Sequence, residues 1–154
     1  LLRELKKWFG GRASLTGVEI NETAARSFKS GGIAAVLADG LRLPFETDSF
    51  DAVFCSLFLH HLSDDDAPRL LAEMARVSRG RIYAIDLNRD PLAYYFYKIA
   101  GRIFLQRLTL EDGALSILRS FTARELRGIA KTARLRHVEV QGSRVNRLVL
   151  SGTK

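Results

Sequence analysis

The hydrophobic and polar positions along the chain alternate between helical and strand-like patterns, and their order predicts a mixed α/β protein. Apolar residues at helical spacing in the first nine positions are followed by Gly10-Gly11, which favours an N-terminal helix that ends there. Short apolar runs bounded by polar or turn residues indicate buried strands. These runs are residues 14–20, 33–38, 50–57 and 81–87.

Helical patterns separate the strands, and several carry a start signal. Asn21 is placed to cap the second helix, and Ser63 with three aspartates precedes a later one, where negative charge suits the positive end of the helix dipole. Thr122 followed three residues later by Glu125 matches a capping box. The helices expected after the first cover residues 21–28, a segment that follows the aspartates and ends at about 78, and residues 90–106, 110–118 and 122–133.

Two C-terminal segments, 135–141 and 144–150, alternate apolar and polar residues around Gly142-Ser143 and predict an antiparallel hairpin. The element order therefore predicts an α/β fold whose sheet is mainly parallel with an antiparallel C-terminal hairpin. The chain has 154 residues, enough for a single domain over 1–154. It begins with Leu1 and its only methionine is Met74, so we expect an N-terminally truncated domain.

Charge is uneven along the chain, whose net charge is +7. Residues 1–78 carry 9 basic and 11 acidic residues, whereas residues 79–154 carry 15 and 6. A basic half suits nucleic acid, an anionic membrane surface or an acidic substrate. Its basic residues are scattered singly, however, and no RNA-recognition or zinc-finger motif accompanies them, which favours a solvated surface over a nucleic acid partner.

The remaining composition narrows the class of protein further. The single cysteine, Cys55, excludes an internal disulfide and a cysteine-cluster metal site, and we expect no metal and a reducing, cytoplasmic location. Cys55 lies in an apolar strand and is expected to be a buried, inert thiol. No run of eighteen or more apolar residues occurs, so the sequence predicts no transmembrane helix.

Two predicted strands end on a carboxylate, Glu19 and, 20 residues later, Asp39. Ligands of parallel α/β sheets bind beyond the carboxyl ends of the strands. A carboxylate at such an end can accept hydrogen bonds from both ribose hydroxyls, and one at the next strand end can accept from an adenine amino group. The alternative is that each residue only caps the loop or helix that follows it.

Four segments of the chain resemble class I S-adenosylmethionine-dependent methyltransferases. They are the strand TGVEI at 16–20 and the runs LADGLRLPF at 37–45, SFDAV at 49–53 and LHHL at 59–62. The similarity is greatest to the ubiquinone/menaquinone C-methyltransferase-like branch and is strong over residues 13–87. It implies a Rossmann-like methyltransferase sheet. The family's first strand and its glycine-rich turn are absent from this chain, so the resemblance implies a sheet lacking the first strand, with a gap.

The resemblance also implies cofactor-binding roles. Glu19 would hold the ribose hydroxyls of S-adenosylmethionine, and Asp39 would accept the adenine amino group. The remaining residues with implied roles are Ile20 against the adenine, the Gly40 and Leu41 backbone beside the ring, and Ser56 facing the methionine part. It implies no catalytic residue.

The acceptor side has three candidates, His60, Tyr95 and Phe96. His60 could act as a general base if the acceptor is a phenol or enol; the alternative is a loop histidine satisfied by the backbone. His60 and His61 are adjacent, so we expect their side chains to point in different directions and at most one of them to face the pocket. Tyr95 and Phe96 belong to an aromatic insert, about 90–121, interpreted as a lid over the carboxyl-end cleft or, alternatively, as core packing. Cations border its apolar face, which suits an amphipathic acceptor and peripheral membrane contact.

The resulting hypothesis is S-adenosylmethionine-dependent methyl transfer to a small-molecule acceptor that is apolar or aromatic. One alternative is a non-catalytic remnant or binding module of the same fold, because the glycine-rich segment is missing. A nicotinamide-dependent oxidoreductase is the third interpretation, since its ribose-binding acid occupies the position of Glu19. Tyr94 and Lys98 match the YxxxK pair of short-chain dehydrogenases, but their spacing also describes one helix face. The sequence indicates no oligomeric state.

Overall fold

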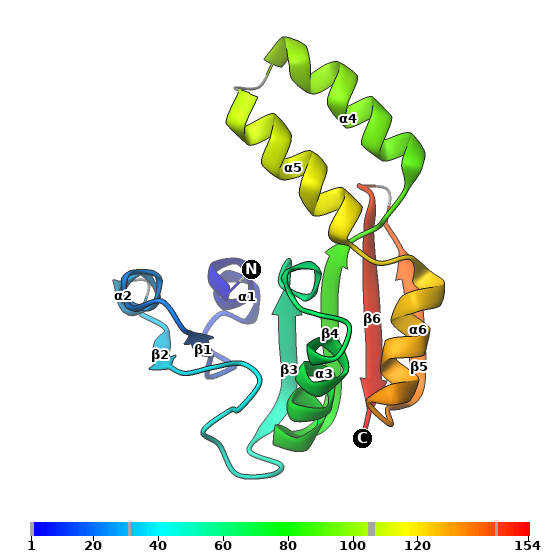
Figure 1. Cartoon of the computed structure of the whole chain (residues 1–154). Helices are drawn as coiled ribbons and strands as arrows, with labels where there is room; N and C mark the ends of the chain where they lie inside the picture. The colour runs from blue at the N-terminus through cyan, green and yellow to red at the C-terminus, as the bar shows by residue number, and fades with distance from the viewer. Residues whose placement is uncertain (1, 31, 105–106, 144) are drawn as a thin grey trace. The chain divides into compact units, whose positions relative to one another are not determined.

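The computed structural model describes residues 2–30, 32–104, 107–143 and 145–154. The chain divides into two compact units, Leu1–Glu46 and Thr47–Lys154 (Figure 1). Four positions used in the sequence-based predictions lie outside the described residues: the helix start at Leu1, the turn residue Gly31, the helix end at Gln106 and the strand start at Arg144.

The described residues of the first unit form two helices and two parallel strands. Its elements are α1 (Leu2–Phe9), β1 (Thr16–Glu19), α2 (Glu22–Ser30) and β2 (Ala34–Leu37). Both glycines after α1 take left-handed backbone angles, with φ of 55° at Gly10 and 82° at Gly11, which is why the helix ends there. Asn21 Oδ1 accepts a hydrogen bond from the Ala24 N–H at 3.1 Å and caps α2 as predicted.

The second unit contains a four-stranded sheet in the order β3-β4-β6-β5. The β3 and β4 strands are parallel, and β6 runs antiparallel to both β4 and β5. The elements of this unit are β3 (Phe50–Ser56), the 3-10 helix η1 (Leu59–His61), α3 (Asp66–Val77), β4 (Ser78–Leu87), α4 (Pro91–Phe104), α5 (Arg107–Arg119), α6 (Ala123–Thr132), β5 (Arg136–Gly142) and β6 (Arg147–Thr153).

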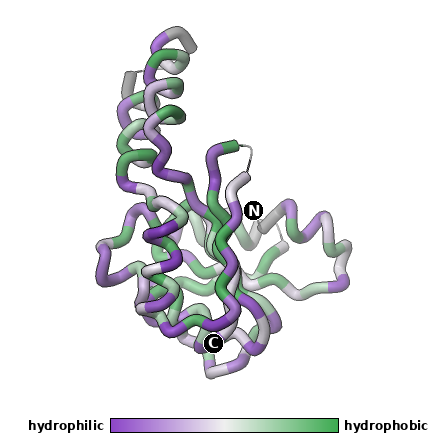
Figure 2. The backbone as a smooth tube through the Cα atoms, turned by 90° about the vertical axis from the view of Figure 1, so that its right-hand side faces the viewer, coloured by the Kyte–Doolittle hydropathy of each residue, from purple (hydrophilic) through white to green (hydrophobic). Residues whose placement is uncertain are grey.

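The core of the second unit lies between the sheet and the two helices α3 and α6, which cover the same face (Figure 1). Leu71 from α3, Leu126 from α6, and Ile82 and Leu150 from the two central strands are all fully buried. Each such side chain stabilises the fold by about 1.5–3 kcal/mol relative to exposure. In Figure 2 the apolar stretches of the strands accordingly run through the middle of the sheet.

The helices α4 and α5 form a hairpin that leaves the sheet at the carboxyl end of β4 and projects beyond it (Figure 1). Inside the hairpin the Tyr97 hydroxyl donates to the Thr109 carbonyl at 3.1 Å. A Cβ on Gly113 would collide with the Tyr97 hydroxyl, so a larger residue there would force the Tyr97 side chain to move. The next helix, α6, has the predicted capping box between Thr122 and Glu125.

The order and type of the predicted elements are confirmed, including the antiparallel C-terminal hairpin. Among the described residues the strands form two sheets, β1-β2 and β3-β4-β6-β5. Within the same described ranges, none of the helices is both long enough and apolar enough to cross a membrane.

Candidate functional site

In the first unit two carboxylates lie at the same edge of the β1-β2 pair. Glu19 at the end of β1 pairs in register with Leu37 of β2, two residues before Asp39. Glu19 Oε1 accepts hydrogen bonds from the backbone N–H groups of Ile20 and Asn21 at 3.0 and 3.1 Å. Asp39 Oδ1 accepts from the Leu41 N–H at 2.9 Å. One oxygen of each carboxylate is thus held by the following loop, as the capping interpretation expects.

The second oxygen of each carboxylate, Oε2 of Glu19 and Oδ2 of Asp39, has no hydrogen-bond partner within the part of the chain that the structure describes. Beside them the Ile20 side chain is 71% exposed. Two fixed acceptors next to an apolar surface suit a planar ring that carries hydroxyl and amino donors. The donor set required by the adenosine part of S-adenosylmethionine therefore fits these residues.

In the second unit a histidine and an aspartate are in contact at the carboxyl ends of β3 and β4. Ser56, the last residue of β3, pairs with Ile85 of β4, and the Leu57 N–H donates to the Ile85 carbonyl at 2.8 Å. Leu57 takes a left-handed φ of 53°, which turns the chain into η1. This turn places His60 against Asp86 near the end of β4.

The His60–Asp86 pair is held by three hydrogen bonds to the carboxylate. His60 Nδ1 lies 2.6 Å from Asp86 Oδ1, which also accepts from the Leu87 N–H at 2.7 Å. The His60 backbone N–H donates to Asp86 Oδ2 at 3.2 Å. The two side chains are 5% and 1% exposed. Because an ionised carboxylate only accepts, a neutral His60 must carry its proton on Nδ1 and leave a lone pair on Nε2.

Two sequence-based expectations about the histidines are wrong. The partner of the His60 side chain is a buried carboxylate from another strand, not the backbone of its own loop. The two histidines were expected to point in different directions, but their ring centroids lie 4.0 Å apart and both residues line one cavity. Burial, followed by the charges of His60 and Arg119, lowers the pKa of His61 below its ordinary value.

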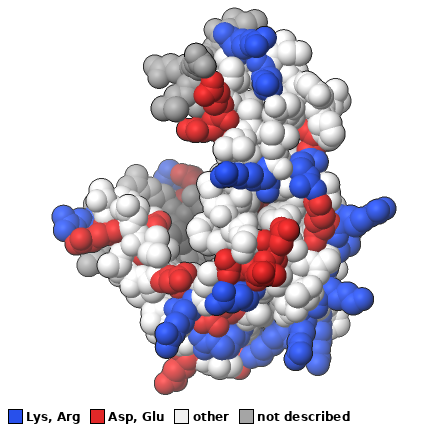
Figure 3. All heavy atoms as spheres, viewed as in Figure 1, with Lys and Arg blue, Asp and Glu red and all other residues white. Residues whose placement is uncertain are grey.

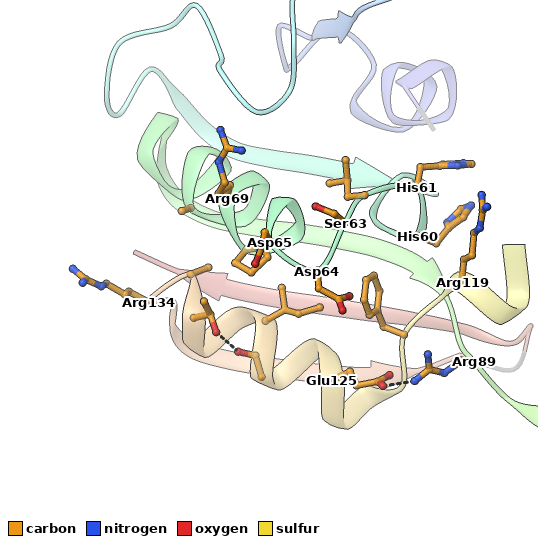
Figure 4. A pocket seen from close by; sticks show the side chains of 18 of the residues that line it. His60, His61, Ser63, Asp64, Asp65, Arg69, Arg89, Arg119, Glu125 and Arg134 are labelled. Carbon is orange, nitrogen blue, oxygen red and sulfur yellow. Dashed lines mark hydrogen bonds and ion pairs between the residues drawn. The ribbon is translucent and has the colours of Figure 1, made fainter.

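The cavity lies between α3 and α6 and has a volume of about 1250 Å³. In Figure 4 His60, His61 and Arg119 lie together at one end, and Glu125 and Arg89 form an ion pair further along the wall. Imidazole and guanidinium groups at one end can take up a proton and stabilise an anion, while the apolar wall of Leu118 and Phe121 can hold a ring. The other lining residues come mainly from the connection between η1 and α3, at 62–65, and from α3 and α6.

Tyr95 and Phe96 do not line this cavity. Both lie on α4 with side chains 62% and 72% exposed, so the core-packing interpretation is wrong for them. The end of α5, with Leu118 and Arg119, borders the cavity instead. The role of Tyr95 and Phe96 toward an acceptor stays a prediction.

The sequence analysis missed two residues of this site, Asp86 and Arg119. The rule that singled out Glu19 and Asp39 as acids at strand ends applies equally to Asp86, which is the sixth residue of the predicted strand 81–87. Arg119 carries no such signal, because nothing in the local sequence places the end of α5 beside η1. Among the residues that the structure describes, no cluster of three or more His, Cys, Asp or Glu residues could hold a metal ion.

Comparison with known proteins identifies the fold and the family. Residues 1–85, more than half of the chain, match the family model described as a methyltransferase domain. A proposed O-methyltransferase from Nostoc punctiforme superposes with a TM-score of 0.69 at 14% identity over 99% of this chain and 48% of its own. A SAM-dependent methyltransferase from Aquifex aeolicus gives a TM-score of 0.71 at 16% identity over 98% of this chain and 74% of its own.

Human N-acetylserotonin methyltransferase, whose structure is a complex with SAM, gives a TM-score of 0.71 at 15% identity over 99% of this chain and 44% of its own. The chain thus spans about half the length of the Nostoc and human proteins, at 48% and 44%. These findings confirm the Rossmann-like methyltransferase fold.

Cys55 gives a direct test of the environment around Asp86. Burial, and secondarily the Asp86 charge, raise the pKa of the Cys55 thiol from 9.0 to about 12. Only the thiolate reacts with iodoacetamide, so at about pH 8 alkylation in the folded chain is expected to be roughly 1000-fold slower than in urea. Mass spectrometry of alkylated peptide over time measures both rates, and equal rates would contradict the raised pKa of this half-buried thiol.

The same shift affects stability at high pH. The unfolded thiol ionises above its ordinary pKa of 9.0, whereas the folded one stays protonated up to about 12. The unfolded chain then binds fewer protons, so the free energy of unfolding falls as pH rises through this window. Cys55→Ser, which has no such group, is the control and should show a smaller fall.

Proposed function

The chain belongs to the methyltransferase domain family, and we propose that it transfers a methyl group to a small apolar or aromatic acceptor whose hydroxyl or enol proton is removed by His60. The observation that carries this proposal is the buried His60–Asp86 pair, whose histidine lines the cavity. S-adenosylmethionine, when bound, supplies an electrophilic methyl group on its sulfonium. The acceptor must then present electron density, and losing a proton provides it.

The first unit would hold the cofactor through its adenosine part. The free oxygens of Glu19 and Asp39 would accept hydrogen bonds from the ribose hydroxyls and the adenine amino group, respectively. Ile20 would pack on the adenine, with the Gly40 and Leu41 backbone beside the ring. The loop hydrogen bonds to each carboxylate support this assignment, because they fix its orientation before the cofactor arrives. Ser56, at the end of β3, is the residue we propose to face the methionine part.

His60 would act as the general base through Nε2. The acceptor proton moves from its oxygen to this nitrogen. The Nδ1 proton stays on the imidazole, hydrogen-bonded to Asp86, and the negative charge of Asp86 stabilises the imidazolium. The low exposure of both side chains strengthens this interaction, since little water screens it. Asp86 is therefore a positioning residue that sets which nitrogen of His60 is free.

Arg119 would favour the deprotonated acceptor. Its guanidinium lies at the same end of the cavity as both histidines (Figure 4). A cation close to an ionising hydroxyl lowers the cost of forming the oxyanion. The electron density released by ionisation lies on the oxygen and on conjugated carbons, and either kind of atom can take the methyl group.

The acceptor class follows from the same residues and from the sequence resemblance. Taken together, the runs at 37–45, 49–53 and 59–62 resemble most the ubiquinone/menaquinone C-methyltransferase-like branch. We therefore propose hydroxylated aromatic or quinol-like rings as the first acceptors to test. The apolar residues Leu118 and Phe121 on the cavity wall support a ring of this kind.

The alternatives make different demands on the same chain. A non-catalytic binding module would bind cofactor through Glu19 without any turnover that depends on His60. A short-chain dehydrogenase would need Lys98 near the Tyr94 hydroxyl, but the Lys98 Nζ lies over the Tyr94 ring, 5.4 Å from its centroid. That contact opposes the oxidoreductase interpretation.

Cofactor binding is expected to depend on Glu19. Glu19→Ala removes charge-assisted hydrogen bonds to two hydroxyls and should raise the Kd for S-adenosylmethionine about tenfold or more in isothermal titration calorimetry. The matched control is Glu22→Ala, which removes an acid three residues away that pairs with Arg26 on the surface of α2. An unchanged Kd in Glu19→Ala, or an equal rise in both variants, would contradict the cofactor assignment.

Turnover is expected to depend on His60. In His60→Asn the side-chain amide can still donate to Asp86, but the Nε2 lone pair is lost. With a panel of substituted phenols and hydroquinones, kcat measured by S-adenosylhomocysteine formation should fall about 100-fold or more.

His61→Asn is the control, because it changes the adjacent ring and leaves the His60–Asp86 pair intact. It should lower kcat less than about threefold, and S-adenosylmethionine affinity should stay within the same factor in both variants. Equal loss in both variants would contradict the assignment of His60 as the base. Turnover that is absent from the unmodified chain, with cofactor binding intact, would favour the non-catalytic module.

A further inference from the structure

We propose that the α4–α5 hairpin docks on an anionic lipid surface through the outer face of α4. Four apolar side chains on this helix follow the spacing i, i+3, i+4 and i+7 and therefore form one stripe. Each is between 62% and 80% exposed. We name this set the α4 stripe: Leu92, Tyr95, Phe96 and Ile99.

The hairpin does not use the α4 stripe for its own packing. Its two helices are joined through a different face, where Tyr97 bonds the Thr109 carbonyl and approaches Gly113. The hairpin also projects beyond the sheet of the second unit, so the stripe does not cover that sheet (Figures 1 and 2). Exposed apolar side chains contiguous on one helix mark a surface that binds something outside the unit.

Charge indicates which partner fits. Between Pro91 and Phe104 the sequence has two basic residues, Lys98 and Arg102, and no acidic one. Both cations are exposed. The acids of the hairpin, Glu111 and Asp112, belong to α5. In Figure 3 blue side chains at both ends of the hairpin accompany a largely uncharged surface, with the acidic residues gathered to one side.

An apolar stripe bordered by cations, with a tyrosine among its members, is the composition of a helix that lies in the headgroup region of a membrane. Each basic residue near an anionic leaflet strengthens partitioning by about fivefold. The excess of 15 basic over 6 acidic residues in 79–154 acts in the same direction. Zwitterionic lipid supplies the apolar contact without this attraction, so anionic lipid should be preferred.

A second copy of the chain fits the α4 stripe less well. Two stripes facing each other would bring Lys98 and Arg102 of both copies to the same border, and like charges there oppose association. An anionic surface compensates all of these charges. The docking proposal does not rest on the proposed reaction, since Glu19, Asp39 and His60 all lie outside the hairpin.

Flotation of the chain with large unilamellar vesicles tests this proposal. Binding to phosphatidylcholine vesicles with about 30 mol % phosphatidylglycerol should exceed binding to pure phosphatidylcholine about twentyfold or more and fall with added salt. Phe96→Glu should lower the partition coefficient about tenfold or more. Val145→Glu is the matched control: it introduces the same charge at a residue that is 71% exposed in the β5–β6 connection, and should stay within about threefold.

A second matched pair of variants tests how much the cations of α4 contribute to vesicle binding. Replacing Lys98 and Arg102 by alanine should weaken binding about twentyfold. Replacing Arg124 and Lys131, two exposed cations of α6, causes the same loss of charge and should have a smaller effect. Circular dichroism melts of every variant establish that the fold is retained.

A third readout locates the contact. Trp8 is the only tryptophan, so in Trp8→Phe with Phe96→Trp the fluorescence should shift to the blue on vesicle binding and be quenched by brominated lipid. Absence of vesicle binding would overturn the proposal, as would binding that Phe96→Glu and Val145→Glu reduce equally. A dimer in sedimentation that Phe96→Glu dissociates, without vesicle binding, would assign the stripe to a second copy and also overturn it.

Discussion

The contact between His60 and Asp86 is the interaction on which the chemistry of the second unit depends. A carboxylate that is 1% exposed would be costly to bury alone, and three hydrogen bonds from His60 and Leu87 compensate for its desolvation. The same contacts fix the imidazole, its tautomer and the path of η1. The Asp86 charge also contributes to the raised pKa of Cys55. One buried carboxylate on β4 therefore affects a side chain near the end of β3 as well.

The two units use the same structural rule at their strand ends. Parallel strands direct the residues that follow them to one edge, and in each unit that edge carries an acid fixed by backbone N–H groups. In the first unit the acids are exposed enough to bind hydroxyl and amino donors. In the second the acid is buried and acts through a histidine. Exposure thus distinguishes a carboxylate suited to binding a ligand from one suited to orienting a base.

Local patterns in the sequence were sufficient for the fold. Strand runs, the Asn21 and Thr122 caps and the Gly10-Gly11 turn depend on neighbouring residues, and the structure confirms each of them. The partner of His60 could not be predicted in the same way, because Asp86 is 26 residues away and meets it only after β3 and β4 pair. Arg119 is more remote still, since its place depends on the path of the α4–α5 hairpin.

The central claim is that Asp86 holds the proton of neutral His60 on Nδ1 and leaves Nε2 free. Long-range ¹H–¹⁵N correlation spectra of histidine-labelled chain report this tautomer directly. With three histidines in the sequence, the His60 signals can be assigned by their loss in His60→Asn. The account predicts that neutral His60 has a protonated Nδ1 and an unprotonated Nε2. A neutral His60 protonated on Nε2 would contradict it.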